Sequence, residues 1–547
     1  MPTLPTLPQA NVDTTYSLPT GTTHVCTTAA QFNTALTNAA LNDIIQLQAG
    51  TTFTGPFTLP NKASGSGWIY IVSSALASLP APGTRVVAAD ATNMPILEVP
   101  AAGTGSATCI SCANGAHHFR FVGIEMRPDT GTPTAGNPAV YTMVELGDVN
   151  VSQANLIHHV IIDRCYIHGR DGQNGPRDGV WLNGANNAVI ESHIDNCKRN
   201  QSDGQEAHAI VGNNGTGPFK IYNNYLEGSS ENVMFGGAGP TTLDMESADI
   251  TIQRNHLFKR LSWVSNAQFV KNLFEIKHAK RVLFEGNICE NNWNGGTGQS
   301  GFAIVLTVRN DGFGAPAQGN LCEDITIRLN KIINVEAGFN MHGTDDLDIS
   351  KGENRILIEN NLVVQDDVSG NGSWRTFQLI NDSGGAGGTF GIDDLTIRHN
   401  TFIAKNGGNS ICCLFRRDST VRANFLAQDN IGDYQSNAIF NGDGLGSGTV
   451  AFALNWSPYV WSNNVMLGSC TNEPAGNFNP ANAAAINFVD YAGGNYRLTA
   501  GTLYAAGGAN DATDGLDQGA DINAIEAAIA GSGSSSVLLT LRPSIMM

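Results

Sequence analysis

Short runs of alternating hydrophobic and polar residues recur along most of the chain. Examples are VIIDRCYI (160–167), ITIQRNHLF (250–258), ITIRLNKII (325–333) and LTIRHNTFI (395–403). Period-two alternation with many β-branched residues predicts strands rather than helical turns. Each run ends in a polar residue followed by another apolar pair, so that polar residue can serve as a marker of the repeat.

The markers show an irregular repeat with steps of 42, 28, 31, 31, 32, 43, 31, 39, 30 and 34 residues. A coil of about 30 residues that holds several strands is too short for crossover helices, so each strand must pair with its copy one coil away. We therefore predict an all-β fold, a right-handed parallel β-helix solenoid, with stacked asparagines along one turn. The markers are Gly123, Cys165, His193, Asn224, Asn255, Asn287, Asn330, Asn361, Asn400, Asn430 and Asn464.

The ends of such a coil need caps, because unpaired backbone and apolar core would otherwise meet water. The amphipathic segment 29–40 predicts an N-terminal capping helix, and segments 496–506 and 520–530 are expected to close the other end. We predict an N-terminal extension at 1–24, a β-helix domain with its caps at 25–530, and a linker with an unplaced tail at 531–547.

Composition and charge limit the partners. The chain has 62 Gly, 14% charged residues and a net charge of −18, which argues against nucleic acid and anionic membranes as partners. It lacks an apolar run of about 18 residues, so membrane insertion is not expected. The start MPTLPTLPQ lacks the pattern of a signal peptide, and we expect a mature secreted form and a monomer.

Two kinds of motif carry metal-binding residue types. Cys109 and Cys112 form a single C-x-x-C, for which a local disulfide, two thiols and a zinc site all stay open. Cys165 and Cys289 fall within the repeat and are expected in the core. The His pairs of AHHFRF (116–121) and HHVIID (158–163) precede strands, and turn histidines are favoured there over a metal site.

A second strand of each coil can be registered by its distance to the next marker. With the first and third positions inward, the second and fourth face outward. One outward column is then Trp181, Ile210, Met234, Glu275, Val305, Asn340, Gln378, Leu414 and Ile439. The other is Asn183, Gly212, Gly236, Lys277, Thr307, His342, Ile380, Arg416 and Asn441.

The middle of these columns concentrates groups that can do chemistry. A Lys held near an Arg gives up its proton more readily, because like charges repel, and can then act as a base. We predict Lys277, Arg309, His342 and Glu275 as catalytic residues. The predicted substrate-binding residues are Asn340, Gln378, Asp345, Asp346, Arg416, and, from the motif DGQEAHA (203–209), Glu206 and His208.

Three segments carry a resemblance to a known superfamily. NLFEIKHAKRVLFEGNICENNW (272–293), GFAIVLTVRN (301–310) and GPFKIYNNYLEGSSENVMFGG (217–237) resemble β-helix repeat proteins of the pectate-lyase-like superfamily. Lys277 on one coil and Arg309 on the next are similar to the pair of the chondroitinase B and alginate lyase family. That resemblance implies Lys277 as base, Arg309 as acid, and a Ca²⁺ cofactor. The calcium-binding carboxylates of the family have no direct match, and Glu231, Asn232 and Asp203 stand nearest as substitutes.

The sequence thus favours a secreted enzyme that binds an anionic, uronate-containing polysaccharide and cleaves it by β-elimination. An inverting glycoside hydrolase that uses Asp345, Asp346 and Glu275 is an alternative. A third possibility is a non-catalytic carbohydrate-binding or adhesive β-helix. Confinement of the polar cluster to the middle coils favours a site over uniform adhesion.

Overall fold

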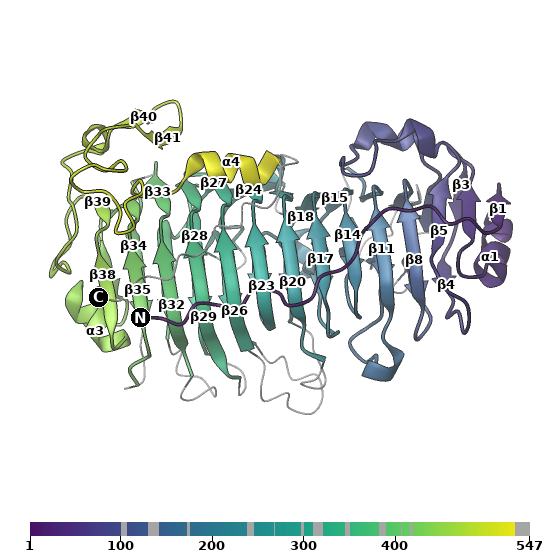
Figure 1. The fold of residues 1–547 in the computed structure, drawn as a ribbon, viewed down its shortest axis with the longest axis horizontal. Coiled ribbons are helices and arrows are strands. Elements are labelled where there is room, and N and C mark those ends of the chain that lie inside the picture. The colour runs from purple at the N-terminus through teal and green to yellow at the C-terminus, as the bar shows by residue number, and fades with distance from the viewer. Residues whose placement is uncertain are drawn as a thin grey trace.

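The computed structural model describes residues 1–530 except for 100–106, 130–141, 172–174, 238–244, 267, 297–299, 310–320, 345–349, 382–389, 406 and 416–419. Over the described residues, successive strands pass in turn to three parallel sheets of 14, 13 and 12 strands, each strand pairing with its copy one coil away. The chain therefore winds as a parallel β-helix, as the repeat predicts (Figure 1).

The 14-stranded sheet, sheet A, carries the repeat from which the markers were taken. Its strands are β1 (Thr23–Cys26), β2 (Ile44–Leu47), β5 (Ile69–Ser73), β8 (His117–Val122), β11 (His158–Asp163), β14 (Asn187–Ile190), β17 (Phe219–Tyr222), β20 (Ala248–Gln253), β23 (Ala279–Glu285), β26 (Leu321–Arg328), β29 (Gly352–Glu359), β32 (Ile392–Arg398), β35 (Phe425–Gln428) and β38 (Tyr459–Ser462).

The 13-stranded sheet, sheet B, follows sheet A around each coil. Its strands are β3 (Thr52–Thr54), β6 (Ile96–Val99), β9 (Glu125–Pro128), β12 (Tyr166–His168), β15 (His193–Cys197), β18 (Tyr225–Gly228), β21 (His256–Phe258), β24 (Ile288–Asn292), β27 (Lys331–Val335), β30 (Leu362–Gln365), β33 (Thr401–Ala404), β36 (Ile431–Asp433) and β39 (Val465–Leu467).

The 12-stranded sheet, sheet C, completes the coil and holds the predicted outward columns. Its strands are β4 (Phe57–Leu59), β7 (Thr108–Cys112), β10 (Thr142–Glu145), β13 (Asp178–Trp181), β16 (His208–Gly212), β19 (Glu231–Phe235), β22 (Asn272–Ile276), β25 (Phe302–Thr307), β28 (Ala337–His342), β31 (Arg375–Ile380), β34 (Ser410–Phe415) and β37 (Ile439–Asn441).

Short helices decorate the coil, and one small antiparallel pair lies near its C-terminal end. The helices are α1 (Ala29–Asn38), α2 (Ser262–Ser265), α3 (Thr449–Asn455) and α4 (Ile522–Ala530), with single 3₁₀ turns at η1 (Leu76–Ser78), η2 (Ala88–Asn93), η3 (Gln153–Asn155), η4 (Gln201–Asp203) and η6 (Ala483–Ile486). The antiparallel pair is β40 (Phe488–Asp490) with β41 (Asn495–Leu498).

An asparagine ladder runs between sheets A and B. The side-chain oxygen of each Asn accepts the backbone N–H of the Asn one coil before it, at 2.9–3.1 Å from Asn224 to Asn464. Toward the N-terminus the ladder passes to Ser192, whose hydroxyl accepts the amide of Cys165 at 3.0 Å. The marker His193 was thus one residue out of register, because a serine takes the ladder position there.

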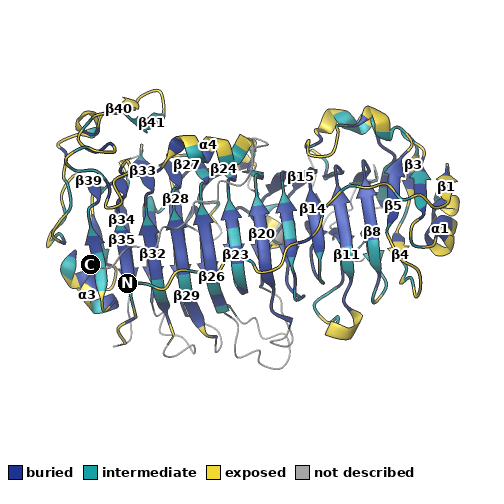
Figure 2. Ribbon diagram, viewed as in Figure 1, coloured by how far each residue is buried: buried dark blue, intermediate teal, exposed yellow. Residues whose placement is uncertain are grey.

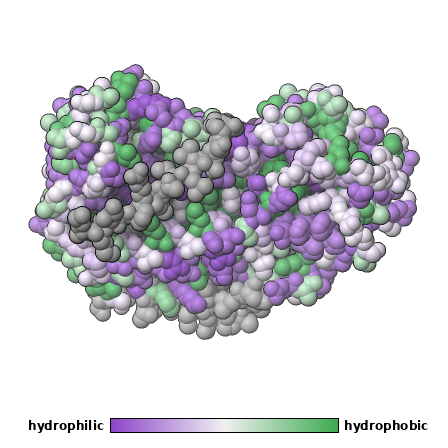
Figure 3. Space-filling model, viewed as in Figure 1, coloured by the Kyte–Doolittle hydropathy of each residue, from purple (hydrophilic) through white to green (hydrophobic). Residues whose placement is uncertain are grey.

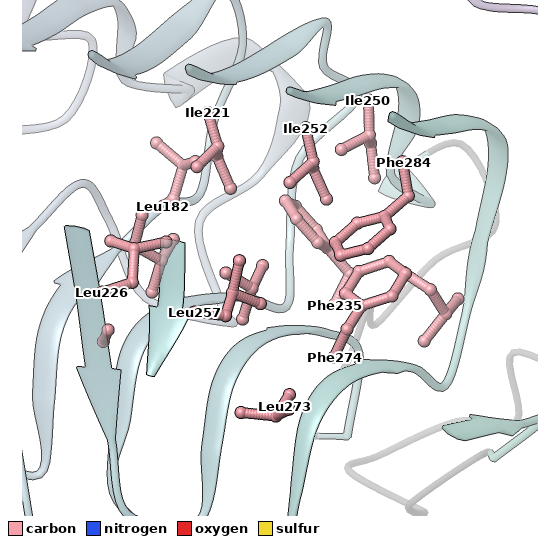
Figure 4. Packing of buried hydrophobic residues seen from close by; sticks show 14 of the residues in the cluster. Leu182, Ile221, Leu226, Phe235, Ile250, Ile252, Leu257, Leu273, Phe274 and Phe284 are labelled. Atoms are coloured by element: carbon pink, nitrogen blue, oxygen red, sulfur yellow. The ribbon is translucent and has the colours of Figure 1, made fainter. Parts of the chain in front are cut away.

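The core fills the space that the three sheets enclose. Its residues are contributed by every coil, and the strand interiors are buried throughout (Figure 2). In the middle coils the rings of Phe274 and Phe284 stack with centroids 4.2 Å apart, beside Phe235 (Figure 4). All ten cysteines are free thiols, and Cys165 and Cys289 lie in this core as predicted.

Helices lie at both ends, but α4 does not close the stack. Helix α1 packs Phe32 against Phe53 and Phe57 at the N-terminal end. At the other end α3 contacts the last coils through Phe452. Helix α4 lies instead along the flank, over β24 and β27 (Figure 1), and buries Ile525 against a cluster with Leu362 and Ile403. Helix α4, which was expected to close the C-terminal end of the coil, therefore packs on an apolar flank of sheet B instead.

A column of charged residues begins the strands of sheet A, and each has a left-handed backbone. From β20 to β32 it reads Asp249, Arg281, Asp324, Arg355 and Asp394, with φ between 51° and 57°. Arg281 donates to Asp249 at 2.7 and 2.9 Å, and Arg355 donates to Asp324 at 2.7 and 3.0 Å. We call these five residues the charge ladder.

The N-terminal segment is bound to the charge ladder as a strap. The amides of Thr3, Thr6 and Gln9 donate to Asp394, Asp324 and Asp249 at 2.8–3.0 Å, so three residues of strap span two coils. Three residues of polyproline II rise about 9.3 Å, close to two strand spacings of about 4.8 Å each. The strap crosses the strands from the C-terminal end of the coil to the N-terminal end (Figure 1). Within the described residues no helix is long and apolar enough to cross a bilayer.

Candidate active site on sheet C

The predicted outward column of sheet C is present in the middle coils. Backbone register aligns Met234, Glu275, Val305, Asn340 and Gln378 on five consecutive strands. Trp181 at the start of the predicted column also belongs to it, but the prediction was wrong at the next coil and at the C-terminal end, where the column residues are Val211, Cys413 and Phe440 rather than Ile210, Leu414 and Ile439. Loops of unequal length separate these strands from the next marker, so a fixed distance to that marker misplaces them by one residue.

Lys277 and Arg309 lie on adjacent coils. The Arg309 amide donates to the Lys277 carbonyl at 3.0 Å, and Thr307 pairs with His342 on the following coil. The Lys277 ammonium is 3.9 Å from a Glu275 carboxylate oxygen, and the two side chains are 15% and 5% exposed. Lys277 and Glu275 are therefore not an exposed surface ion pair of the kind that contributes little to a protein.

Two glycines make room for the Lys277 side chain. Gly236 and Gly237 have φ of 99° and 97°, a region that favours glycine. A Cβ on Gly236 would lie 2.8 Å from the Lys277 Cβ, and one on Gly237 would lie 3.4 Å from the Lys277 Nζ. The backbone of the preceding coil thus lies close to the Lys277 side chain from Cβ to Nζ and restricts its conformation.

Polar side chains continue along the column beyond Lys277. Gln378 donates its amide to Asn340 at 3.0 Å and accepts from the Arg375 guanidinium. The amide of His342 donates to buried Glu353 at 3.0 Å, which ties the end of β28 to β29. Glu275, Lys277, Asn340 and His342 therefore share one outer face of sheet C, as the alternation predicts.

A buried ion-pair network lies beside this face, at the start of the strands. His208 contacts Asp178 at 2.7 Å through Nδ1 and Glu231 at 3.1 Å through Nε2. The Lys271 ammonium is 2.6 Å from Glu231 and 2.8 Å from Glu206. The Glu231 side chain is fully buried, and its charge is balanced by direct ion pairs with His208 and Lys271.

The network shifts the protonation of its members. Burial lowers the pKa of His208, but hydrogen bonds to Asp178 and Glu231 outweigh it and raise the pKa to about 9. Burial raises the pKa of Glu231, yet Lys271 and His208 hold it well below its usual range. Burial also raises the pKa of Glu275, and Lys277 and Lys271 only partly oppose this. His208 is thus a cation and Glu231 an anion at neutral pH.

The residues predicted to hold calcium do not fit that ion. Lys271 and His208 engage both oxygens of Glu231. The Asn232 oxygen accepts from the Lys259 ammonium at 2.9 Å, and its amide donates to two backbone carbonyls at 2.8 Å. Calcium requires six to eight oxygen ligands around one point, whereas these oxygens face two lysine ammonium groups. Asp203 ends η4, and its side chain lies outside the described residues.

The other predicted site residues divide into three groups. Asp345, Asp346 and Arg416 lie outside the described residues. Glu206 is part-exposed and pairs with Lys271 at the edge of the face. His208 was predicted to bind substrate, but it is 2% exposed and its ring is held between two carboxylates. Its place in the network corrects that prediction.

Sequence reasoning missed Asp178, Lys271 and Arg375. Asp178, His208, Glu231 and Asn272 align by register three positions before the outward column, so a second row of polar residues was readable from the same alignment. Lys271 precedes β22 and gives no periodic signal. Its partners come from other coils, 40 and 65 residues earlier, which no local pattern reveals.

Comparisons with known proteins give similar structures but no family. No family model and no curated protein matches this chain. A mannuronic-acid-specific family 6 polysaccharide lyase from human gut microbiota is 11% identical, with a TM-score of 0.47 over 85% of this chain and 92% of that one. A family 6 alginate lyase is 13% identical, with a TM-score of 0.44 over 84% of this chain and 53% of that one.

A pectate lyase is a third similar structure, at 11% identity and a TM-score of 0.31 over 87% of this chain and 85% of that one. Likenesses at this level of identity and TM-score transfer no activity or substrate. The class that the fold and site define is therefore a parallel β-helix protein with a polar cluster on the outer face of its middle coils.

Proposed function

We propose that this protein is an extracellular polysaccharide lyase that cleaves an anionic, uronate-containing polysaccharide by β-elimination. One observation carries the proposal: the hydrogen bond from the Arg309 amide to the Lys277 carbonyl sets a lysine and an arginine on adjacent coils of one outer face. A base beside a permanent cation is the arrangement that proton removal next to a carboxylate requires.

The chemistry assigns a role to each group. Lys277 takes the proton at C5 of the uronate, and Arg309 neutralises the adjacent carboxylate. The electron pair then forms a C4–C5 double bond while the C4–O bond breaks. The leaving oxygen takes a proton from His342 or Arg309. Arginine stays protonated in proteins, so it suits the carboxylate better than the proton transfer.

The local charge supports an anionic substrate on a chain of net charge −18. Arg309 and Arg375 lie on or beside one face, and positive side chains raise the local concentration of an anionic ligand. The Asn340 and Gln378 amides, hydrogen-bonded to each other at 3.0 Å, add neutral groups of the kind that bind sugar hydroxyls.

Calcium has no part in this mechanism, because the oxygens of Glu231 and Asn232 face ammonium and imidazolium groups. We expect a metal chelator to leave turnover within about twofold of its starting value, since no proposed step needs the ion. A chelator-sensitive activity that calcium restores would instead place a calcium site at residues other than Glu231 and Asn232.

The test is a panel of purified uronate polymers and neutral glycans, followed for two signals. Ultraviolet absorbance of unsaturated ends together with new reducing ends, on uronate polymers only, supports the lyase. Reducing ends without absorbance would replace it with hydrolysis, and absence of both on every polymer would leave a binding protein.

A further inference from the structure

Four histidines from two adjacent coils meet at the start of sheet A. His117 and His118 begin β8, and His158 and His159 lie at the start of β11. The rings of His117 and His158 stack with centroids 4.8 Å apart, and those of His118 and His159 stack at 4.5 Å. Ring nitrogens of His118, His158 and His159 all lie within 4.8 Å of one another. We call the four residues the histidine cluster.

Close contacts within each pair show that nitrogen lone pairs converge. The Nδ1 atoms of His117 and His118 are 2.7 Å apart, and those of His158 and His159 are 2.8 Å apart. Two ring nitrogens at this distance must share one proton, because two N–H groups or two lone pairs would repel. In each pair, one Nδ1 atom is therefore unprotonated and accepts the proton of the other. A metal cation can displace that shared proton.

A backbone carbonyl orients one of the rings. His117 Nε2 is 3.0 Å from the Lys62 carbonyl oxygen, which can only accept, so the Nε2 atom carries the proton. The Nδ1 lone pair of His117 then points at His118. His118 therefore donates its Nδ1–H to His117, and donation of the second ring N–H to an outer partner is how metal-binding histidines are oriented and made more basic.

The cluster is reachable from solvent, and no carboxylate in the described part of the chain forms an ion pair with it. His117 and His158 line an open pocket of about 570 Å³ together with Asn61, Lys62 and Gln153. All four histidines are half-buried.

We propose that the histidine cluster is a binding site for a divalent first-row transition metal, Zn²⁺ or Cu²⁺, held by His118, His158 and His159. Imidazole nitrogens suit zinc, copper and nickel, whereas calcium and magnesium require oxygen ligands. An ion there links the coils of β8 and β11. The site lies apart from Lys277 and Arg309 and does not depend on the proposed lyase activity.

The same positions elsewhere in sheet A show what the cluster replaces. His118 and His159 have φ of 59° and 56°, and they occupy the column that the charge ladder fills further along the coil. Asn186 and Asn424 have φ of 54° in that column. A turn can thus be built there from Asn, which favours this backbone region, and four histidines are not needed for the turn.

The test uses the full chain, stripped of metal and titrated with Zn²⁺ by calorimetry and with Cu²⁺ by electron paramagnetic resonance. We expect one ion per chain, nitrogen hyperfine structure from copper, and a higher melting temperature with zinc. The double variant His118→Asn with His159→Asn keeps the left-handed turns. It should weaken binding by more than the roughly 10- to 100-fold that loss of an outer partner costs.

Two controls locate the ion. His256→Gln removes a histidine paired with Glu290 elsewhere and should leave binding unchanged. Glu206→Gln alters the other group of metal-binding residue types, Glu206 with His208 and Glu231. The proposal is overturned if wild type binds no stoichiometric ion, or if the double Asn variant, folded by its melting transition, binds as tightly as wild type. Binding lost in Glu206→Gln alone also overturns it.

Discussion

Two faces of the same coil carry charge in different ways. On sheet A the charge ladder alternates Asp and Arg regularly, and part-exposed Arg281 and Arg355 each pair with the Asp of the coil before. On sheet C, His208, Glu231, Lys271, Glu275 and Lys277 follow no alternation, are mostly buried, and lie within three consecutive coils. Periodic charge satisfies a repeating backbone, whereas aperiodic buried charge costs stability, which indicates selection for a task.

The largest expected difference concerns activity. Lys277→Ala should lower turnover by at least about a hundredfold, because a general base contributes 10²–10⁴-fold. Its melting temperature should stay within a few degrees of wild type. Initial rates of absorbance on the best uronate polymer measure the effect. Arg355→Gln on the charge ladder is the matched control and should retain full turnover. Equal activity in Lys277→Ala and wild type would reject the base assignment.

The next largest difference concerns stability. Lys271→Met should destabilise the fold by about 3–5 kcal/mol, because it leaves Glu231 buried with only His208 as partner. Urea unfolding measures the change. The double variant Lys271→Met with Glu231→Gln should recover part of the loss, since the uncompensated charge is removed. A loss below about 1 kcal/mol, as for an exposed pair, would mean that water reaches Glu231.

The pH dependence of the unfolding free energy should also report on the buried network of sheet C, through His208. The pKa of His208 is raised from 6.5 to about 9 in the fold, so its stabilising effect is full below pH 6.5 and is lost as pH rises through 9. Free energies of unfolding at pH 6 to 9.5 should fall more steeply for wild type than for His208→Gln. Parallel curves for the two proteins would show that His208 does not carry this linkage.

The smallest effect is expected on the charge ladder. Asp324→Asn removes the ion pair with Arg355 but keeps an oxygen for the Thr6 amide, and should cost about 1 kcal/mol or less. The corresponding substitution Glu231→Gln, at a fully buried side chain, should cost several times more. Chemical unfolding of both variants gives the ratio. A large loss of unfolding free energy in Asp324→Asn would instead show that the charge ladder contributes strongly to the stability of the fold.

The sequence predicted the parts of the molecule that repeat. The asparagine spacing gave the coil, and alternation gave the outer face at Glu275 and Asn340, because both follow a local period. The prediction of the outward column was wrong at Ile210 and Leu414, because the length of the loops changes there. The partners of Glu231 were also missed, because Lys271 reaches it across a coil boundary that only the folded chain defines.

The strap has a mechanical consequence. Its three hydrogen bonds to Asp394, Asp324 and Asp249 lie in a row along the coil axis. A pull on the N-terminus along that axis loads all three together, in shear, whereas a pull away from the face breaks them one at a time. Figure 3 shows this face, with hydrophilic and hydrophobic residues interspersed outside the grey atoms. The strap begins beside the late coils and crosses toward the early ones (Figure 1). Stretching along the axis is therefore resisted by a second chain segment as well as by the coil itself.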